Sequence, residues 1–347
     1  AVQAAVSANT PLKTECEKLG IETVVVDPFT SSGIFKFWKR LKALMTHDKN
    51  LKVIHLHSTQ EVPHVWGALF TKLFSKARTP KVILQSHIWI NHKKKDPVHW
   101  LLYKVIDEMW CSSEAAKKSL LRSLPIPESK YRIVKYGRDV DGIQQSFLSR
   151  EESRKKLNVP TDALVLGCVS RLEPSKGVRE FIEASVPALE INKAIHLVIV
   201  GGPSPKDQIA EDYAKALQTL MQAMPSEIKS RIHFTGPLPE SYKYLKAFDL
   251  YILPSYQETF SLALLDALLA GLPVLGTASG GTPDVVVPGQ TGWLFKPRDT
   301  DDLKHALGQA LQSCNLWPTL GRNASAMVSQ GYDQKEIFDG ILRAYAQ

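Results

Sequence analysis

The segment of the chain that is most informative about its fold is Leu253-Pro-Ser-Tyr-Gln-Glu-Thr-Phe-Ser-Leu-Ala-Leu-Leu-Asp-Ala-Leu-Leu-Ala-Gly-Leu-Pro-Val274. It predicts a strand that ends at Leu253, a helix that begins near Phe260, and a turn at Gly271 and Pro273 that leads into the next strand. A strand, a helix and a second strand in direct succession form the repeating unit of a parallel sheet.

The same alternation continues along most of the chain. Short runs rich in Val and Ile, without polar residues at alternate positions, predict parallel strands that helices cover on both faces. The predicted strands are residues 2–7, 23–26, 53–56, 81–85, 109–112, 131–135, 164–169, 196–200, 232–234, 250–253, 274–276 and 293–295. The fold class is therefore α/β, with two doubly wound, Rossmann-like domains and a ligand expected between them at the carboxyl ends of the strands.

A polar stretch at residues 144–156 predicts the domain boundary. We expect an N-terminal domain at residues 1–150, a C-terminal domain at 151–331, and a final helix at 332–347 that crosses back to the first domain. Because residues 2–7 resemble a second strand rather than a first one, we expect the first strand–turn–helix unit of the N-terminal domain to be missing. The alternative is a divergent fold.

Composition excludes several classes of protein. Apolar residues make up 44% and charged residues 22% of the 347, which is typical of globular proteins. No run approaches the roughly 20 apolar residues that cross a membrane. The four cysteines are widely separated, which favours reduced core thiols in a cytoplasmic protein rather than a metal or redox site.

The net charge of +8 is unevenly distributed. Residues 1–150 carry 24 Lys and Arg against 13 Asp and Glu, whereas residues 151–347 carry 19 against 22. A basic first half predicts an anionic partner, either a membrane surface or a polyanionic acceptor. Nucleic acid is not expected, because the chain has no zinc finger, aromatic RNA-binding signature or Arg-rich arm.

Two carboxylates in the opening stretch are candidates for ligand binding. Glu258 lies in the loop after the strand, and Asp266 follows two helical turns later, close to the same face. The backbone N–H groups at the start of the helix, with its positive dipole end, form a site for phosphate. Both acids are therefore expected to reach one elongated ligand.

This stretch resembles the retaining glycosyltransferases of the GT-B fold, glycosyltransferase family 4. The family's pattern is a Glu, seven residues and a second Glu. The resemblance implies that Glu258 contacts the hydroxyls of the donor sugar and that Asp266 holds the nucleotide ribose. This chain departs from the pattern, because Asp266 is one methylene shorter and Thr259 and Ser261 replace two glycines, which leaves the amides of Phe260 and Ser261 available.

A second match is Gly167-Cys-Val-Ser-Arg-Leu-Glu-Pro-Ser-Lys-Gly177. By resemblance Arg171 and Lys176 bind the donor diphosphate, and Gly201 belongs to the next strand end. Two cations and a helix N-terminus can replace a metal ion at a leaving diphosphate. We therefore expect a metal-independent reaction without a cofactor, with a UDP- or GDP-sugar as donor. The close likeness covers residues 160–310.

The first half offers histidines at strand ends. A lone His at such a position is more often structural than catalytic, but the family places one beside the donor sugar, and His87 matches it better than His57. Asp139-Val-Asp141 matches a metal-binding motif of a different glycosyltransferase fold, and we do not favour this interpretation.

Residues 34–45 have one apolar face flanked by Lys and Arg, which fits either a core-packed helix or an interfacial helix on anionic lipid.

The expected function is transfer of a sugar from a nucleotide-sugar donor to a hydroxyl acceptor with retention of configuration. The resemblance places this in lipopolysaccharide, polysaccharide or glycolipid biosynthesis, at the cytoplasmic face of the membrane, with a lipid-linked or glycan acceptor. Two alternatives remain open. One is a nucleotide-sugar epimerase of the same fold, and the other is a non-catalytic protein that binds nucleotide sugars.

Overall fold

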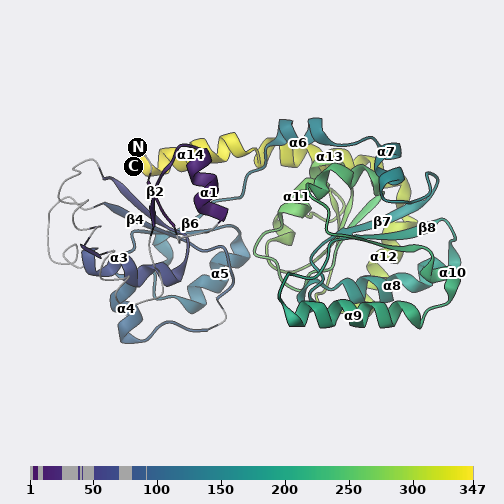
Figure 1. The fold of residues 1–347 in the computed structure, drawn as a ribbon, viewed down its shortest axis with the longest axis horizontal. Helices are drawn as coiled ribbons and strands as arrows, with labels where there is room; N and C mark the ends of the chain where they lie inside the picture. The colour runs from purple at the N-terminus through teal and green to yellow at the C-terminus, as the bar shows by residue number, and fades with distance from the viewer. Residues whose placement is uncertain are drawn as a thin grey trace. The chain divides into compact units, whose positions relative to one another are not determined.

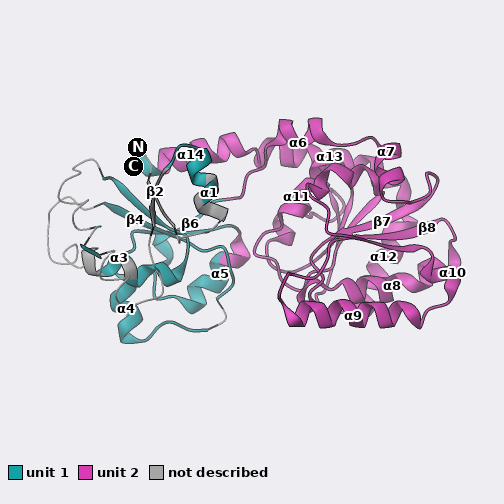
Figure 2. Cartoon of the chain, viewed as in Figure 1, with its two compact units in different colours: residues 1–112, 117–134, 345–347 teal, residues 113–116, 135–344 magenta. Residues whose placement is uncertain are grey.

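The computed structural model describes residues 3–6, 11–25, 38–39, 41, 51–69, 80–90 and 92–346. The chain forms two compact units (Figure 2). Unit 1 consists of Ala1–Ser112, Lys117–Val134 and Tyr345–Gln347, and unit 2 of Ser113–Ala116 and Lys135–Ala344. Strands and helices alternate in both units (Figure 1), which confirms the predicted α/β class.

Unit 1 contains two parallel sheets among its described residues. The larger has the order β3-β4-β5-β6, and β1 and β2 pair separately. In the larger sheet, Val82, Ile83 and Leu84 of β4 are fully buried. The elements are β1 (Gln3–Val6), α1 (Pro11–Lys18), β2 (Glu22–Val25), β3 (Val53–Leu56), α3 (Val62–Leu69), β4 (Lys81–Gln85), α4 (Pro97–Tyr103), β5 (Glu108–Cys111), α5 (Glu114–Ser123) and β6 (Tyr131–Ile133).

Unit 2 is built on one parallel sheet with the order β12-β11-β10-β7-β8-β9. Its strands are β7 (Leu164–Val169), β8 (Ile195–Val200), β9 (Ile232–Gly236), β10 (Leu250–Leu253), β11 (Val274–Thr277) and β12 (Gly292–Phe295). Its α-helices are α6 (Val140–Ser146), α7 (Arg150–Lys156), α8 (Val178–Ile191), α9 (Gln208–Gln222), α10 (Ser226–Lys229), α11 (Leu262–Leu269), α12 (Thr300–Gln312), α13 (Trp317–Gly331) and α14 (Gln334–Ala346).

Both faces of the unit 2 sheet are buried. Successive strand residues enter two separate apolar clusters, with Val165 and Tyr251 in one and Leu166 and Ile252 in the other. Helices α8, α9 and α12 lie on one side of the sheet, and α11 and α13 lie on the other (Figure 1). This arrangement explains why the strand sequences are continuous apolar runs rather than alternating ones.

Residues 135–150, which the sequence assigned to the first half, group with unit 2. Val140 and Ile143 of α6 are buried in a unit 2 core cluster. The side chain of Arg154 in α7 is fully buried, and its Nη2 lies 2.8 Å from Oδ2 of Asp249. The predicted final helix at 332–347 was assigned to the first domain, but residues 332–344 group with unit 2 and only Tyr345–Gln347 group with unit 1.

The predictions for the four cysteines and for the helix at residues 34–45 have different outcomes. Cys16, Cys111 and Cys168 are buried, but Cys314 is exposed, so the expectation of four core thiols is wrong for Cys314. Of the candidate interfacial helix at 34–45, only residues 38, 39 and 41 are described, and the rest lies outside the described residues. Within the described parts of the chain, no helix is both long and apolar enough to cross a membrane.

Candidate functional site

The strand order of unit 2 reverses between β7 and β10. These strands are neighbours, while β8 and β9 extend the sheet on one side and β11 and β12 on the other. In open parallel sheets, ligands bind at the carboxyl ends of the strands at such a reversal. The loops that follow β7 and β10 are therefore the first place to look for a site.

These two loops are bound to each other. The backbone N–H of Tyr256 donates to the carbonyl of Ser175 at 2.9 Å. Gly177 has a φ of 65°, and a Cβ at this position would lie 2.1 Å from the carbonyl oxygen of Pro254. A glycine is therefore required both by the left-handed backbone and by the close approach of the loops.

Lys176 and Glu258 meet between these loops. The Nζ of Lys176 lies 2.6 Å from Oε1 of Glu258, and their side chains are only 16% and 15% exposed. The carbonyl of Glu258 accepts the N–H of Gly281 at 2.9 Å, and a Cβ on Gly280 would collide with that carbonyl. The structure thus brings together two of the predicted site residues from loops 82 positions apart.

Arg171 has a different environment. Its side chain is 62% exposed, and Nη1 lies 2.7 Å from Oε1 of Glu173. The same Nη1 donates to Oγ of Ser204 at 3.3 Å, beyond the end of β8. Gly201 lies at this edge too, where a Cβ would be 1.8 Å from the carbonyl of Ser170. Arg171 therefore lies at the same sheet edge, but it forms its ion pair with Glu173.

The segment that precedes α11 differs from its prediction. The helix begins at Leu262 rather than near Phe260, and the Oγ of Ser261 accepts the N–H of Leu264 at 3.2 Å. The ring of Phe260 is buried and stacks on Tyr332 with a centroid distance of 5.8 Å. Ser261 is thus an N-cap, which is a helix-starting role typical of serine.

The loop residue Thr259 is held by its backbone. Its carbonyl accepts a hydrogen bond from Oγ of Ser113 at 3.1 Å. The same Oγ accepts the N–H of Ala116 at 3.1 Å, at the start of α5. Ser113 was not predicted, because a serine after a strand end has no distinctive sequence signal.

Asp266 is buried and forms an ion pair that the sequence analysis did not predict. Nε of Arg138 donates to Oδ1 at 2.6 Å, and Nη2 donates to Oδ2 at 2.9 Å. Burial raises the pKa of Asp266 to about 6, and the positive charge of Arg138 opposes this rise. No periodic pattern in the sequence connects Arg138 with Asp266, which are 128 positions apart.

The side chain of Tyr251 in β10 is fully buried. Its hydroxyl donates to the carbonyl of Val169 at 3.3 Å. Burial raises the pKa of Tyr251 well above its usual value.

The histidines of unit 1 form a stack at the ends of β3 and β4. Nδ1 of His57 lies 3.2 Å from Nε2 of His87, and their rings are nearly parallel. His55 stacks on His57 and shares a hydrogen bond with the hydroxyl of Tyr345. Burial lowers the pKa of all three histidines, that of His55 to about 3. All three rings are therefore mostly neutral at pH 7.

The alternative metal motif has a structural role. Oδ1 of Asp139 accepts the N–H of Gly142 at 3.1 Å and caps α6. In the part of the chain that the structure describes, no group of three or more His, Cys, Asp or Glu side chains is placed to hold a metal ion.

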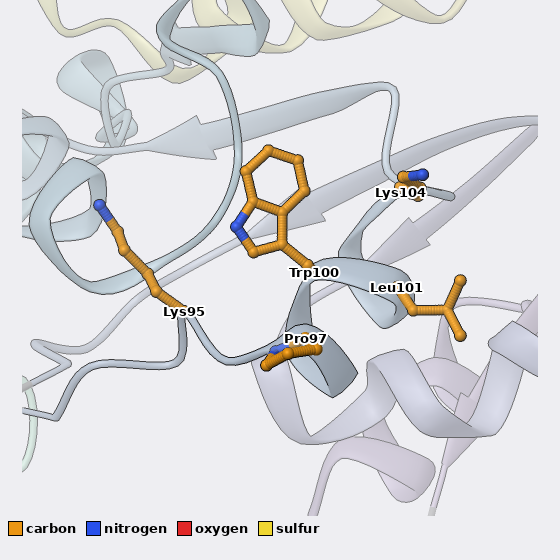
Figure 3. A pocket seen from close by; sticks show the side chains of 5 residues that line it. All are labelled: Lys95, Pro97, Trp100, Leu101 and Lys104. Carbon is orange, nitrogen blue, oxygen red and sulfur yellow. The ribbon is translucent and has the colours of Figure 1, made fainter.

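A surface pocket of unit 1 combines apolar and basic residues. It is lined by Lys95, Pro97, Trp100, Leu101 and Lys104. Figure 3 shows Trp100 and Leu101 projecting from α4, with Lys95 on the segment that leads into the helix. Trp100 is 51% exposed, and the nearby Val98 is 65% exposed.

Replacement of Asp266 by Asn is expected to change how stability depends on pH. The pKa of about 6 in the folded chain exceeds the ordinary 3.8. Protonation of Asp266 therefore stabilises the folded chain fully below pH 4. This stabilisation falls as the pH rises and is lost above about pH 6. At about 1.4 kcal/mol per pKa unit, the change is about 3 kcal/mol. Urea unfolding across this range should show a weaker pH dependence for Asp266→Asn, and equal dependence in both proteins would contradict the assignment.

Comparison with known proteins identifies the family. A family model described as "Glycosyl transferases group 1" matches residues 149–327, just over half of the chain. The D-inositol 3-phosphate glycosyltransferase of Corynebacterium efficiens is 35% identical over 153 residues, which are 43% of this chain and 35% of that protein. The enzyme of the same name from Corynebacterium jeikeium is 32% identical over 198 residues, 56% of this chain and 46% of that protein. The matched part is thus a third to a half of these relatives' length.

Solved structures share the fold over nearly the whole chain. Anabaena Alr3699/HepE in complex with UDP has a TM-score of 0.79 at 20% identity and covers 99% of this chain and 91% of its own. A glycosyltransferase from Rickettsia africae has a TM-score of 0.81 at 16% identity and covers 99% and 97%. At such identities the likeness shows the fold, which is GT-B as the sequence predicted. With the family match over β7 to β12, the chain belongs to the glycosyl transferases of group 1.

Proposed function

We propose that this protein is a glycosyltransferase that moves a sugar from a nucleotide-sugar donor to a hydroxyl acceptor, and that unit 2 binds the donor. The observation that carries the proposal is the Lys176–Glu258 pair. It places a cation and a carboxylate, both largely buried, at the point where the strand order reverses. Both residues also lie within the matched family region.

The two cations are suited to a leaving diphosphate. Charge grows on the diphosphate as the sugar bond breaks, so fixed positive groups that face it lower the barrier. Lys176 is already held in place by Glu258. Arg171 is mostly exposed, so exchanging the carboxylate of Glu173 for a phosphate costs little. We propose that the reaction needs neither a metal ion nor another cofactor.

The two acids are assigned to different parts of the donor. Glu258, beside Lys176, would accept hydrogen bonds from hydroxyls of the transferred sugar. Asp266 would accept them from the ribose, as carboxylates do in other nucleotide sites. The backbone of Thr259, Phe260 and Ser261 would lie near the phosphates. Solved structures of the Anabaena relative contain UDP and UDP-glucose, so we propose a uridine nucleotide sugar as the first candidate donor.

Unit 1 is proposed to bind the acceptor. His87 is the proposed catalytic residue of this unit, with a mostly neutral ring that can accept a proton. Transfer is proposed to occur with retention, with the departing phosphate helping to deprotonate the acceptor hydroxyl. The named Corynebacterium relatives make D-inositol 3-phosphate one acceptor to test, and a lipid-linked or glycan acceptor of the cell envelope is another.

We also propose that unit 1 contacts an anionic membrane surface. The exposed Val98, Trp100 and Leu101 near Lys95 and Lys104 form the combination that favours the boundary between lipid headgroups and acyl chains. Lysines add attraction to anionic lipids, and this attraction falls as salt rises.

Product analysis tests the proposed reaction. With UDP-glucose and an acceptor such as D-inositol 3-phosphate, we expect UDP and a new glycoside, whose anomeric coupling in NMR matches that of the donor. Lys176→Ala should lose most of this turnover, and its unfolding curve should show that the variant is still folded at the assay temperature although the unpaired Glu258 lowers its stability. An isomerised nucleotide sugar formed without acceptor would indicate an epimerase. Binding without turnover across a panel of donors and acceptors would indicate a non-catalytic protein.

The two acids should respond differently to amide substitution. Asp266→Asn removes a charged hydrogen bond to an unreacting part of the donor, so donor affinity should fall about ten- to 150-fold, from about 1.5–3 kcal/mol. Glu258→Gln should lower kcat with a smaller effect on affinity, because the sugar changes its charge and shape in the transition state. Calorimetry and steady-state kinetics measure the two effects. Unchanged affinity in Asp266→Asn with lost affinity in Glu258→Gln would reverse the assignment.

Vesicle sedimentation tests the membrane contact. The protein should bind vesicles that contain phosphatidylglycerol more tightly than vesicles of phosphatidylcholine, and less tightly as salt rises. Trp100→Ala combined with Lys95→Gln and Lys104→Gln should weaken this binding. A control with Lys229→Gln and Lys304→Gln, which neutralises two exposed lysines of unit 2, should retain it. Equal loss in both variants would show that only the overall charge matters.

A further inference from the structure

The Arg138–Asp266 ion pair is unusual because it neutralises a proposed ligand-binding carboxylate inside the protein. The pair is bidentate, with distances of 2.6 and 2.9 Å, and the two side chains are 20% and 9% exposed. Bidentate pairing fixes the plane of the carboxylate as well as its charge. No sequence pattern required an arginine at this position.

The backbone holds Arg138 firmly in place. Its N–H donates to the carbonyl of Tyr332, and its own carbonyl accepts the N–H of Gln334, both at 2.8 Å. The preceding Gly137 has no side chain because a Cβ would lie 2.4 Å from Cα of Gln334. The guanidinium carbon lies 5.9 Å from the ring centre of Tyr242. The backbone at Arg138 is therefore held by hydrogen bonds that do not involve Asp266.

Other charged side chains lie on the elements that pack against α11, which are α13, α6 and the 3-10 turn Ser241–Ala247. They have other partners or face solvent, and Arg138 is the charge that acts on Asp266. They are Lys246, which donates to the carbonyl of Ala270; Lys243, which pairs with Glu240; Arg322, which donates to Thr319; Asp139, which caps α6; and Asp141, which is exposed. From the sheet, the hydroxyl of Tyr251 donates to the carbonyl of Val169.

We infer that Arg138 is a positioning residue of the donor site, which keeps Asp266 charged and in one orientation so that its oxygens accept the ribose hydroxyls. Each carboxylate oxygen can accept about two hydrogen bonds, so the two bonds from Arg138 leave one position free on each oxygen. One free acceptor position on each oxygen suits two neighbouring hydroxyls. The inference rests on the proposed function, because it assumes that the ribose lies against Asp266.

Loss of Arg138 should alter donor binding through the protonation of Asp266. Burial already favours the neutral acid, and removing the one opposing charge raises the pKa of Asp266 further. A protonated carboxyl has lost one acceptor oxygen to its own proton and is a weaker partner for hydroxyls. The affinity of the Arg138→Gln variant should therefore depend on pH in a higher range than that of the wild type.

The experiment measures the Kd of UDP-glucose by calorimetry between pH 5 and 9. This probe is chosen because its phosphates carry no proton in that range. Wild-type affinity should fall as the pH drops through about 6. Arg138→Gln should bind UDP-glucose at least tenfold more weakly than the wild type at pH 7 and should regain affinity at higher pH. The midpoint of the pH dependence of its Kd should lie at least one pH unit above that of the wild type. Arg138→Lys keeps the positive charge but cannot form the bidentate pair. The midpoint of its pH dependence should lie between those of the wild type and Arg138→Gln.

Two controls separate positioning from structural damage. Arg150→Gln removes an exposed arginine that pairs with Asp249, at the opposite end of β10, and should leave the midpoint unchanged. In the Asp266→Asn background, Arg138→Gln should cause no further midpoint shift and little further loss. An unchanged midpoint in Arg138→Gln, or an equal loss in both backgrounds, would overturn the inference. If the wild type binds neither UDP-glucose nor GDP-mannose, the proposed donor site itself is wrong.

Discussion

The parallel pairing of β7 with β10 is the constraint on which the site depends. Because the strand order reverses there, the loops after these two strands emerge side by side although they are far apart in the chain. Their separation is so small that Gly177 cannot carry a side chain, and Gly280, in the loop after β11, is equally close to the carbonyl of Glu258. The Lys176–Glu258 ion pair forms in this confined space, where limited exposure to water strengthens the attraction between the charges.

Asp266 shows a balance of two opposing effects. Its position on a helix packed against the core removes the carboxylate from water, which favours the protonated form, while Arg138 favours the charged form. Buried ion pairs contribute little net stability when desolvation is counted. An ion pair at this position is therefore better explained by orientation and charge at a binding site than by a gain in folding free energy.

Unit 1 uses burial in another way. The stacked rings of His55, His57 and His87 lose water and lie close to one another, so each protonation is unfavourable and the rings stay mostly neutral. Tyr345, near the end of α14, contacts both His55 and Trp110. Tyr345 thus packs at the His55 end of the stack, while His87, the proposed catalytic residue, lies against His57.

The fold class could be predicted from the amino-acid sequence alone. Apolar runs such as residues 164–169 and 250–253 located strands to the residue, because a strand buried on both faces must be apolar throughout. The resemblance to known glycosyltransferases assigned Lys176 and Glu258 to one donor site, and the structure places them on neighbouring loops. Only the tertiary structure paired Arg138 with Asp266 and stacked His57 on His87, because these contacts join segments whose separation along the chain leaves no periodic pattern. It also decided that Ser261 caps α11, since which hydroxyl accepts a helix N–H depends on the backbone angles of the turn rather than on residue type alone.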